Sequence, residues 1–180
     1  RAYLPIPTST TFRTEAGVEV HAHVYAPTNP GFGGPAGELP PYVMFAHGGP
    51  TGSVQPALDL EIAYFTSRGI GVADVNYGGS TGYGRAYRER LRHGWGVVDV
   101  DDCAAVARGL VAAGQADPDR LALRGGSAGG WTAVASISRS GIYRGTVAQY
   151  PITDPLDWAE QTHDFESRYL DGLVGVLPED

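Results

Sequence analysis

The sequence predicts an α/β layered fold with a mostly parallel sheet. Short apolar runs of strand length alternate with segments in which apolar residues recur every three to four positions. Along the chain the expected order is strand, strand, strand–helix, strand–helix, strand–helix and strand. Parallel strands need long crossover connections, which helices usually supply. No internal repeat or low-complexity tract competes with this interpretation.

Length and composition fit one domain with a core, since the 180 residues are 42% hydrophobic. The net charge is −7 and no basic cluster is present, so we expect no nucleic-acid partner. No apolar run approaches the ~18 residues of a membrane span, so no membrane partner is expected either. The single cysteine, Cys103, fits a reducing compartment and hence a cytoplasmic location. Its place on an apolar helix face predicts a buried small hydrophobe.

The first two expected strands form a hairpin. Residues 10–14 make the first strand and residues 15–17 the turn. Residues 18–26 alternate with a period of two, which predicts a strand with one buried face: Val18, Val20, Ala22, Val24 and Ala26. On its polar face, His21 and His23 are a conceivable metal pair. With no third ligand in view, solvent-facing histidines are the better interpretation.

A Pro- and Gly-rich stretch, residues 27–41, is expected to be loop, and residues 42–46 a buried strand. Helical spacing follows, with Gly69 as its stop: Leu58, Ile62 and Phe65. Residues 70–75 form the next buried strand. The Gly- and Tyr-rich connection of residues 76–96 is too long to be idle in a compact domain.

A helix is expected over residues 97–113, with an inward apolar stripe: Val100, Cys103, Ala104, Ala107, Leu110 and Val111. Three acids, Asp99, Asp101 and Asp102, cluster in its first turn. A solvated helix start in which the acids favour the helix dipole is the preferred interpretation, with a metal site as the alternative.

The last expected elements begin at Leu121, where a short strand leads into a helix over residues 127–138. Residues 146–150 form one more buried strand. Where the strand from Leu121 passes into the helix, the sequence is Gly125-Gly126-Ser127-Ala128-Gly129, a Gly-x-Ser-x-Gly motif in a strand–turn–helix context. That context is typical of a nucleophile elbow, which holds a serine at a strained turn. The alternative is an ordinary capping serine in a Gly-rich turn.

An activated serine also needs donors for the oxyanion that its attack creates. One is the backbone N–H of Ala128, the residue after Ser127. The other is expected from the loop after the third strand, His47-Gly48-Gly49-Pro50, through Gly49 or Gly48. His47 itself is expected to be structural, and a plain Pro-Gly turn is the alternative for this segment.

Three motifs together resemble the prolyl oligopeptidase family, above all its acylaminoacyl-peptidase and dipeptidyl-aminopeptidase branch: His47-Gly48-Gly49-Pro50-Thr51, Asn76-Tyr77-Gly78-Gly79-Ser80-Thr81-Gly82-Tyr83-Gly84 and the motif around Ser127. The resemblance implies an α/β-hydrolase three-layer sandwich that cleaves short peptides without a cofactor or metal. It makes Ser127 the acylated nucleophile, with Gly49 (or Gly48) and Ala128 as the oxyanion hole. The family usually carries a β-propeller before this domain, and these residues contain none.

The acid and base of the catalytic triad are the main departure. This fold places them after the serine, acid first and histidine last. His163 is the only histidine after Ser127, and Asp154 and Asp157 precede it. The resemblance places the acid and the base after two later strands, whereas residues 157–169 are expected to form a helix. His163 is therefore not the expected base. We therefore expect residues 1–180 to be a partial hydrolase domain that lacks the last two strands and has little activity alone.

Two expectations follow for partners and substrates. The strand at 146–150 becomes a sheet edge prone to pair with a second copy or with the remainder of the same protein. Trp131, Tyr150 and Trp158 are candidates for an acyl or side-chain pocket, with core packing as the alternative. A serine peptidase is the predicted function. A carboxylesterase of the same fold and a non-catalytic interaction module remain the alternatives.

Overall fold

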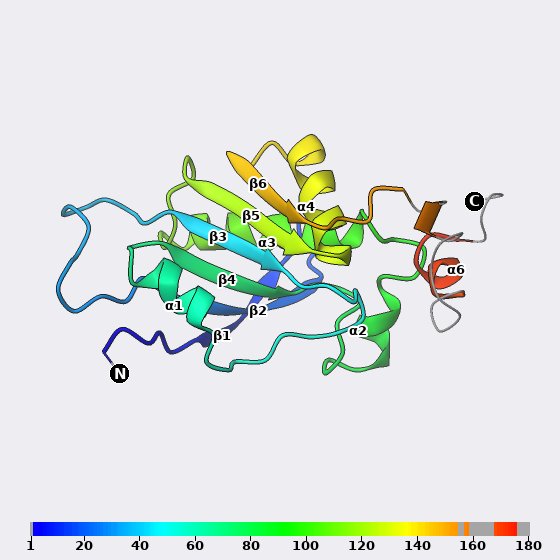
Figure 1. Ribbon diagram of the computed structural model, residues 1–180, viewed down its shortest axis with the longest axis horizontal. Coiled ribbons are helices and arrows are strands. Elements are labelled where there is room, and N and C mark those ends of the chain that lie inside the picture. The colour runs from blue at the N-terminus through cyan, green and yellow to red at the C-terminus, as the bar shows by residue number, and fades with distance from the viewer. Residues whose placement is uncertain (1, 155–156, 159–167, 176–180) are drawn as a thin grey trace.

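The computed structural model describes residues 2–154, 157–158 and 168–175, and its strands form one sheet with the order β1-β2-β4-β3-β5-β6 (Figure 1). The strands are β1 (Thr8–Arg13), β2 (Glu19–Tyr25), β3 (Tyr42–Ala46), β4 (Gly71–Asn76), β5 (Leu121–Gly126) and β6 (Gly145–Gln149). β1 and β2 form an antiparallel hairpin, and β2 is antiparallel to β4. The other neighbours are parallel. The predicted α/β fold with a mostly parallel sheet is confirmed.

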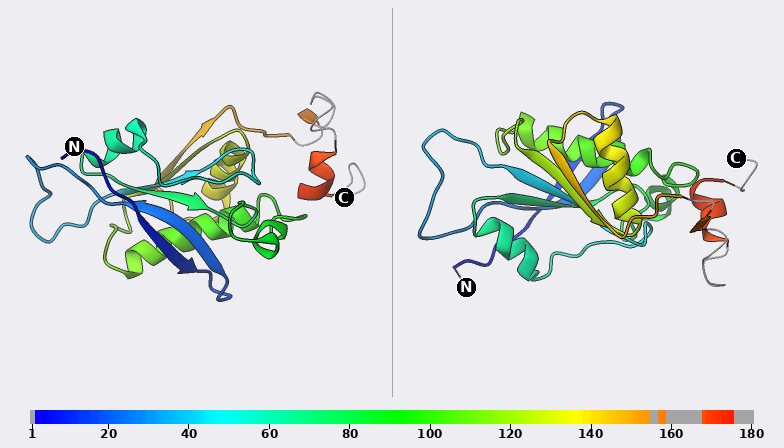
Figure 2. Two further views of the ribbon diagram at one scale, coloured as in Figure 1. Left: turned by 90° about the horizontal axis from the view of Figure 1, so that it is seen from below. Right: turned by 45° about the horizontal axis from the view of Figure 1, so that its top comes forward.

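Helices cover both faces of this sheet (Figure 2). α1 (Leu60–Thr66) packs on one face, while α3 (Val98–Ala112) and α4 (Ala128–Arg139) pack together on the other. Two short helices, α2 (Arg85–Glu89) and α6 (Tyr169–Leu173), lie outside these layers. The result is the three-layer arrangement that the order of elements predicts.

The larger core lies between the sheet and α3. Met44 of β3, Val75 of β4 and Leu123 of β5 are fully buried there because alternate strand residues point to the same face. Cys103 and Leu110 of α3 meet them and are also fully buried. The expectation of a buried, hydrophobe-like Cys103 is confirmed.

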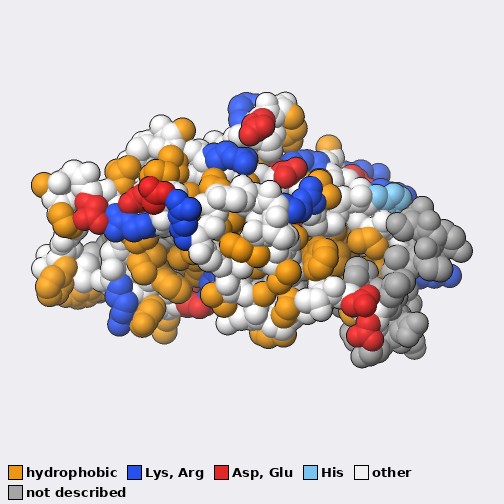
Figure 3. All heavy atoms as spheres, turned by 90° about the horizontal axis from the view of Figure 1, so that it is seen from above, with side chains coloured by type: hydrophobic (Ala, Val, Ile, Leu, Met, Phe, Trp, Pro, Cys, Tyr) orange, Lys and Arg blue, Asp and Glu red, His pale blue; other side chains and the backbone are white. Residues whose placement is uncertain are grey.

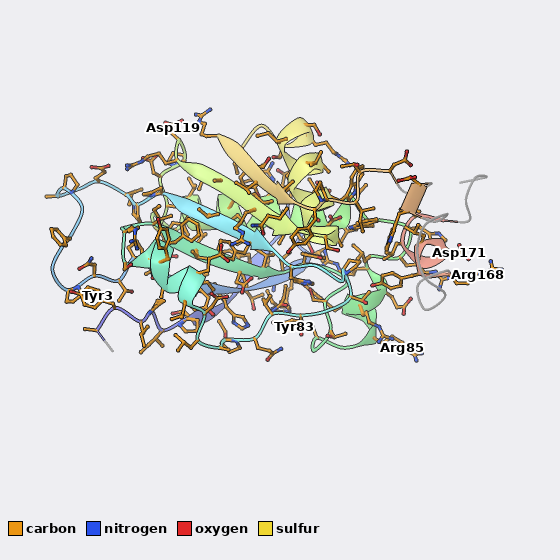
Figure 4. All side chains as sticks on the ribbon, viewed as in Figure 1. Tyr3, Tyr83, Arg85, Asp119, Arg168 and Asp171 are labelled. Atoms are coloured by element: carbon orange, nitrogen blue, oxygen red, sulfur yellow. The ribbon has the colours of Figure 1, made fainter. Side chains whose placement is uncertain are left out.

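The expectation of solvent-facing histidines on β2 is wrong for His23, whereas His21 is partly exposed. His23 is only 7% exposed, and its Nδ1 lies 3.1 Å from the hydroxyl of Ser9. His21 is half-buried and stacks on Tyr83, with ring centroids 4.1 Å apart. Tyr83, labelled in Figure 4, belongs to the 76–96 connection, which returns to cover this part of the strand. Among the described residues, no three potential ligands are grouped to hold a metal ion.

The acids at the start of α3 are not solvated either. Asp99 is fully buried and accepts hydrogen bonds from the Gly96 N–H (2.6 Å) and the Thr132 hydroxyl (2.5 Å). Asp102 accepts from the Gly78 N–H and from Arg90, both at 2.7 Å. Burial raises the pKa of both carboxyls, that of Asp99 to about 6.

These buried acids tie the 76–96 connection to α3, and Asp99 also ties α3 to α4. The expectation of a solvated helix start is therefore wrong for Asp99 and Asp102, whereas Asp101 is exposed. Within the described part of the chain, no helix is both long and apolar enough to cross a bilayer. The helix expected over residues 157–169 falls mostly outside the described residues, and His163 lies outside them too.

Candidate active site

The site is positioned by the carboxyl ends of two neighbouring parallel strands. β3 and β5 pair so that Ala46 is the partner of Gly125. Loops that leave such strand ends meet at one edge of the sheet, where open α/β folds bind ligands. The segment 47–50 and Ser127 are therefore delivered to the same place.

Ser127 occupies a strained bend between β5 and α4. Its φ of 54° and ψ of −121° lie outside the regions that non-glycine residues favour. It is the N-cap residue of α4, yet its side chain makes no capping hydrogen bond. The half-buried hydroxyl has no hydrogen-bond partner among the described residues, so the interpretation as an ordinary capping serine has no support.

The glycines on either side of Ser127 allow α4 to start against the strand ends. A Cβ atom on Gly125 would overlap the carbonyl group of Gly129, and one on Gly129 would overlap that of Ala46. Both obstacles are backbone atoms, which cannot rotate away. Only glycine therefore fits at these two positions of the elbow.

The segment 47–50, the oxyanion-loop candidate, lies directly against Ser127. A Cβ atom on Gly48 would be 3.4 Å from the Cβ of Ser127 and 3.1 Å from the carbonyl oxygen of Gly126. Gly49 has a φ of 55°, which favours glycine. In the described part of the chain, the backbone N–H groups of Gly49 and Ala128 donate to no acceptor. Ala128 is buried at the positive end of α4, so this pair of free donors suits a developing negative charge.

His47 also lies at this site, but its ring contacts groups other than Ser127. Its Nδ1 lies 2.9 Å from the carbonyl oxygen of Gly48, and its Nε2 lies 2.8 Å from the hydroxyl of Ser80. Its ring stacks on Tyr77 at 4.3 Å, and burial lowers its pKa. Both ring nitrogens thus have partners, Gly48 in the same loop and Ser80 in the 76–96 connection, in agreement with the structural role expected from the sequence.

A cleft of about 320 Å³ opens at Ser127. Gly48, Gly126 and Tyr150 line it, and Tyr150 is 78% exposed at this opening. This position is compatible with the predicted pocket role of Tyr150, which stays a prediction. The other two pocket candidates are not among the residues that line this cleft.

Trp131 and Trp158 instead pack in an aromatic cluster. Each ring centroid lies 6.0 Å from that of Trp95, and Trp158 also meets Tyr169 edge-on. Both tryptophans pack against the main core. This placement agrees with the alternative of core packing, and their assignment to a substrate pocket stays a prediction.

Sequence reasoning missed the charged wall of the cleft. Asp74 of β4 lines it, and burial together with the nearby Asp59 raises its pKa to about 7. Arg124 of β5 forms an ion pair with Glu61 of α1 and lies 4.5 Å over the ring of Phe45. The signal that could have revealed this wall is the acid Asp74 inside an otherwise apolar strand.

Comparison with known proteins agrees with this geometry. The family model described as "Prolyl oligopeptidase family" matches residues 56–177. An acylamino-acid-releasing enzyme of Arabidopsis thaliana is 31% identical over 155 residues, which cover 76% of this chain and 20% of the relative.

Two solved structures are more similar in sequence. A puromycin hydrolase is 64% identical with a TM-score of 0.96, over 99% of this chain and 27% of that one. A puromycin-hydrolyzing peptidase of Mycobacterium tuberculosis is 60% identical with a TM-score of 0.96, over 98% of this chain and 27% of that one. The chain thus spans about a fifth of the curated relative and about a quarter of these solved chains. On this evidence, the chain belongs to the prolyl oligopeptidase family of serine peptidases.

Proposed function

We propose that this chain supplies the nucleophile and the oxyanion hole of a serine-type exo- or oligopeptidase that cleaves short peptides. The observation that carries the proposal is that Ser127 sits on a strained bend and that its hydroxyl, like the amide donors of Gly49 and Ala128 from two separate loops, has no hydrogen-bond partner among the described residues. Together they match what attack on a carbonyl group requires.

In the proposed reaction the Oγ of Ser127 attacks the carbonyl carbon of the scissile peptide bond. Its proton passes to a histidine base, and the carbonyl oxygen becomes an oxyanion that the N–H groups of Gly49 and Ala128 stabilise. Collapse breaks the C–N bond, and the leaving amine takes the proton from the histidine. Water then attacks the ester carbonyl of the acyl-enzyme and gives a proton to the histidine. Collapse breaks the C–O bond to Ser127, releases the acid and returns the proton to the serine oxygen.

The base and its orienting acid are proposed to lie outside the described residues. Both ring nitrogens of His47 already have hydrogen-bond partners, so His47 is not free to act as the base. His163, which lies outside the described residues, is one candidate for the base. We further propose that the isolated 180-residue chain turns over substrate slowly. In a comparable triad, loss of the histidine costs roughly 10⁶-fold in kcat. Robust turnover by the isolated chain would overturn this and favour His163.

Peptides are the proposed substrates because the relatives named above act as acylamino-acid-releasing and puromycin-hydrolysing enzymes. A carboxylesterase is the second candidate, since the same elbow and oxyanion loop serve both reactions. Parallel assays of the natural protein that contains this sequence, with aminoacyl-anilides and short acyl esters, separate the two. A peptidase cleaves the anilides efficiently, whereas an esterase cleaves only the esters.

Labelling with a fluorophosphonate tests whether the site is catalytic at all. We expect the natural protein to be labelled on Ser127 and the Ser127→Ala variant to be unlabelled and inactive. Ser136→Ala is a matched control, because Ser136 is fully buried on α4 and its hydroxyl has no hydrogen-bond partner in the described part of the protein. A natural protein that stays unlabelled would instead indicate a non-catalytic interaction module.

A further inference from the structure

The oxyanion-loop candidate is held by a hydrogen-bonded chain that begins on the next loop. Ser80, fully buried in the 76–96 connection, lies 2.8 Å from Nε2 of His47. Nδ1 of the same ring lies 2.9 Å from the carbonyl oxygen of Gly48. One imidazole ring therefore bridges a buried hydroxyl and the peptide group that precedes Gly49.

The partners of the ring determine where its proton lies. A carbonyl oxygen only accepts hydrogen bonds, so Nδ1 of His47 must carry the proton toward Gly48. Burial lowers the pKa of His47, which favours the neutral ring, and Nε2 is then an acceptor. A serine hydroxyl can donate as well as accept, so Ser80 donates to Nε2 of this tautomer and stabilises it.

The rest of the connection keeps this arrangement rigid. The ring of Tyr77 stacks on His47, and its hydroxyl donates to the carbonyl oxygen of His47 at 2.7 Å. Tyr77 is fully buried, and its own carbonyl oxygen accepts from the N–H of Ser80 at 2.9 Å. At the far end, the carbonyl oxygen of Gly49 accepts from the N–H of Gly52.

Peptide geometry then fixes the direction of the free donor. The carbonyl of Gly48 and the N–H of Gly49 belong to one planar trans peptide group and point in opposite directions. Holding the carbonyl against the His47 ring therefore turns the Gly49 N–H away from that ring. The same segment lies against Ser127 through Gly48.

We propose that Ser80 is a positioning residue for the oxyanion hole: it holds His47 as the Nδ1–H tautomer, which orients the Gly48–Gly49 peptide so that the Gly49 N–H faces the oxyanion. This proposal rests on the proposed hydrolase function. It assigns a role to a fully buried residue that is not among those lining the cleft at Ser127.

The kinetic test uses Ser80→Ala in the natural protein. A misoriented donor stabilises the transition state less and leaves substrate binding in the ground state unchanged. We therefore expect kcat to fall while KM stays within about 2-fold. For Ser80→Ala we expect a fall of about 10- to 100-fold, less than the ~10²–10³-fold of losing a donor outright. Ser80→Cys keeps a weak donor and restores part of kcat. Ser136→Ala removes a buried hydroxyl that has no hydrogen-bond partner among the residues described, and it leaves both constants unchanged.

A spectroscopic arm is independent of activity. The ¹⁵N NMR shifts of the His47 ring in the unmodified protein must show the neutral Nδ1–H tautomer at pH 7. An Nε2–H tautomer or a charged ring overturns the proposal, as does a folded Ser80→Ala variant with unchanged kcat. If the natural protein is not labelled at Ser127, the proposed function fails first, and the NMR result still decides how His47 is held.

Discussion

The backbone of Gly48 lies against the side chain of Ser127, with 3.4 Å between the Cβ of Ser127 and the place where a Cβ of Gly48 would be. This contact joins two loops that are about eighty residues apart in sequence. It exists because β3 and β5 are parallel neighbours whose carboxyl ends are in register at Ala46 and Gly125. The geometry of the candidate oxyanion hole therefore depends on the absence of a side chain at Gly48.

The first prediction concerns Gly48→Ala. The added methyl group would also lie 3.1 Å from the carbonyl oxygen of Gly126, so the loop must shift by a few tenths of an ångström. Small displacements of a catalytic donor are costly, and we expect kcat/KM of the natural protein to fall by about 10-fold or more. Gly34→Ala is the control, because a Cβ there meets nothing within 4 Å. Equal activity of the two variants would show that Gly48 is not part of the site.

A second prediction separates folding from catalysis. In Gly129→Ala the new methyl group overlaps the backbone carbonyl of Ala46, so α4 cannot start where it does. We expect a loss of about 3 kcal/mol or more in unfolding free energy, seen as a lower Tm and a lower soluble yield. Gly145→Ala, where a Cβ has open space, serves as the control. A Gly129→Ala protein with unchanged Tm would contradict the close packing of helix on strand.

The pH dependence of stability tests the charged wall of the cleft. Because the pKa of Asp74 is raised to about 7, the folded protein holds a proton that the unfolded chain releases above its ordinary pKa of 3.8. Its contribution to stability is therefore lost as the pH rises from about 4 to 7. We expect Asp74→Asn to gain Tm relative to the unmodified protein at pH 8 and to gain less at pH 5. Asp101→Asn, which changes an exposed acid on α3, is the control. An equal effect of Asp74→Asn at both pH values would contradict the assignment.

The fourth prediction concerns β6, the last strand of the sheet in the described part of the chain. Val147 of β6 is 57% exposed, and the neighbouring α4 also carries exposed apolar side chains, Val134 and Ile137. Figure 3 shows hydrophobic side chains scattered over the face of the molecule that is seen from above. We propose that the isolated 180-residue chain self-associates through this edge. Val147→Lys should shift the sedimentation profile toward monomer, whereas Ile137→Lys, on the helix, should not. A clean monomer at all concentrations would count against edge pairing.

The sequence was most informative where the determinants of structure are local. The elbow is specified within five residues, because Gly125 and Gly129 permit the close approach that puts Ser127 on its bend. The period-two and helical patterns likewise predicted the strands and helices around it. The family resemblance rested on three such local motifs, and the family match confirms it.

The features that sequence reasoning missed are produced by contacts between distant segments. Periodicity places Asp99 and Asp102 in the first turn of a helix. It does not show that Gly78, Arg90 and Gly96 return to bind and bury them. His23 is buried for the same kind of reason, since its partner Ser9 comes from the preceding strand. Such burial depends on how a long connection folds back, and no local pattern reports it.

The most direct test of the account is a crystal structure of the natural protein after reaction with a fluorophosphonate. We expect a bond from the phosphorus to Oγ of Ser127, with the phosphonyl oxygen about 2.7–3.1 Å from the backbone nitrogens of both Gly49 and Ala128. An adduct on another residue, or a phosphonyl oxygen turned away from these two amides, would contradict it.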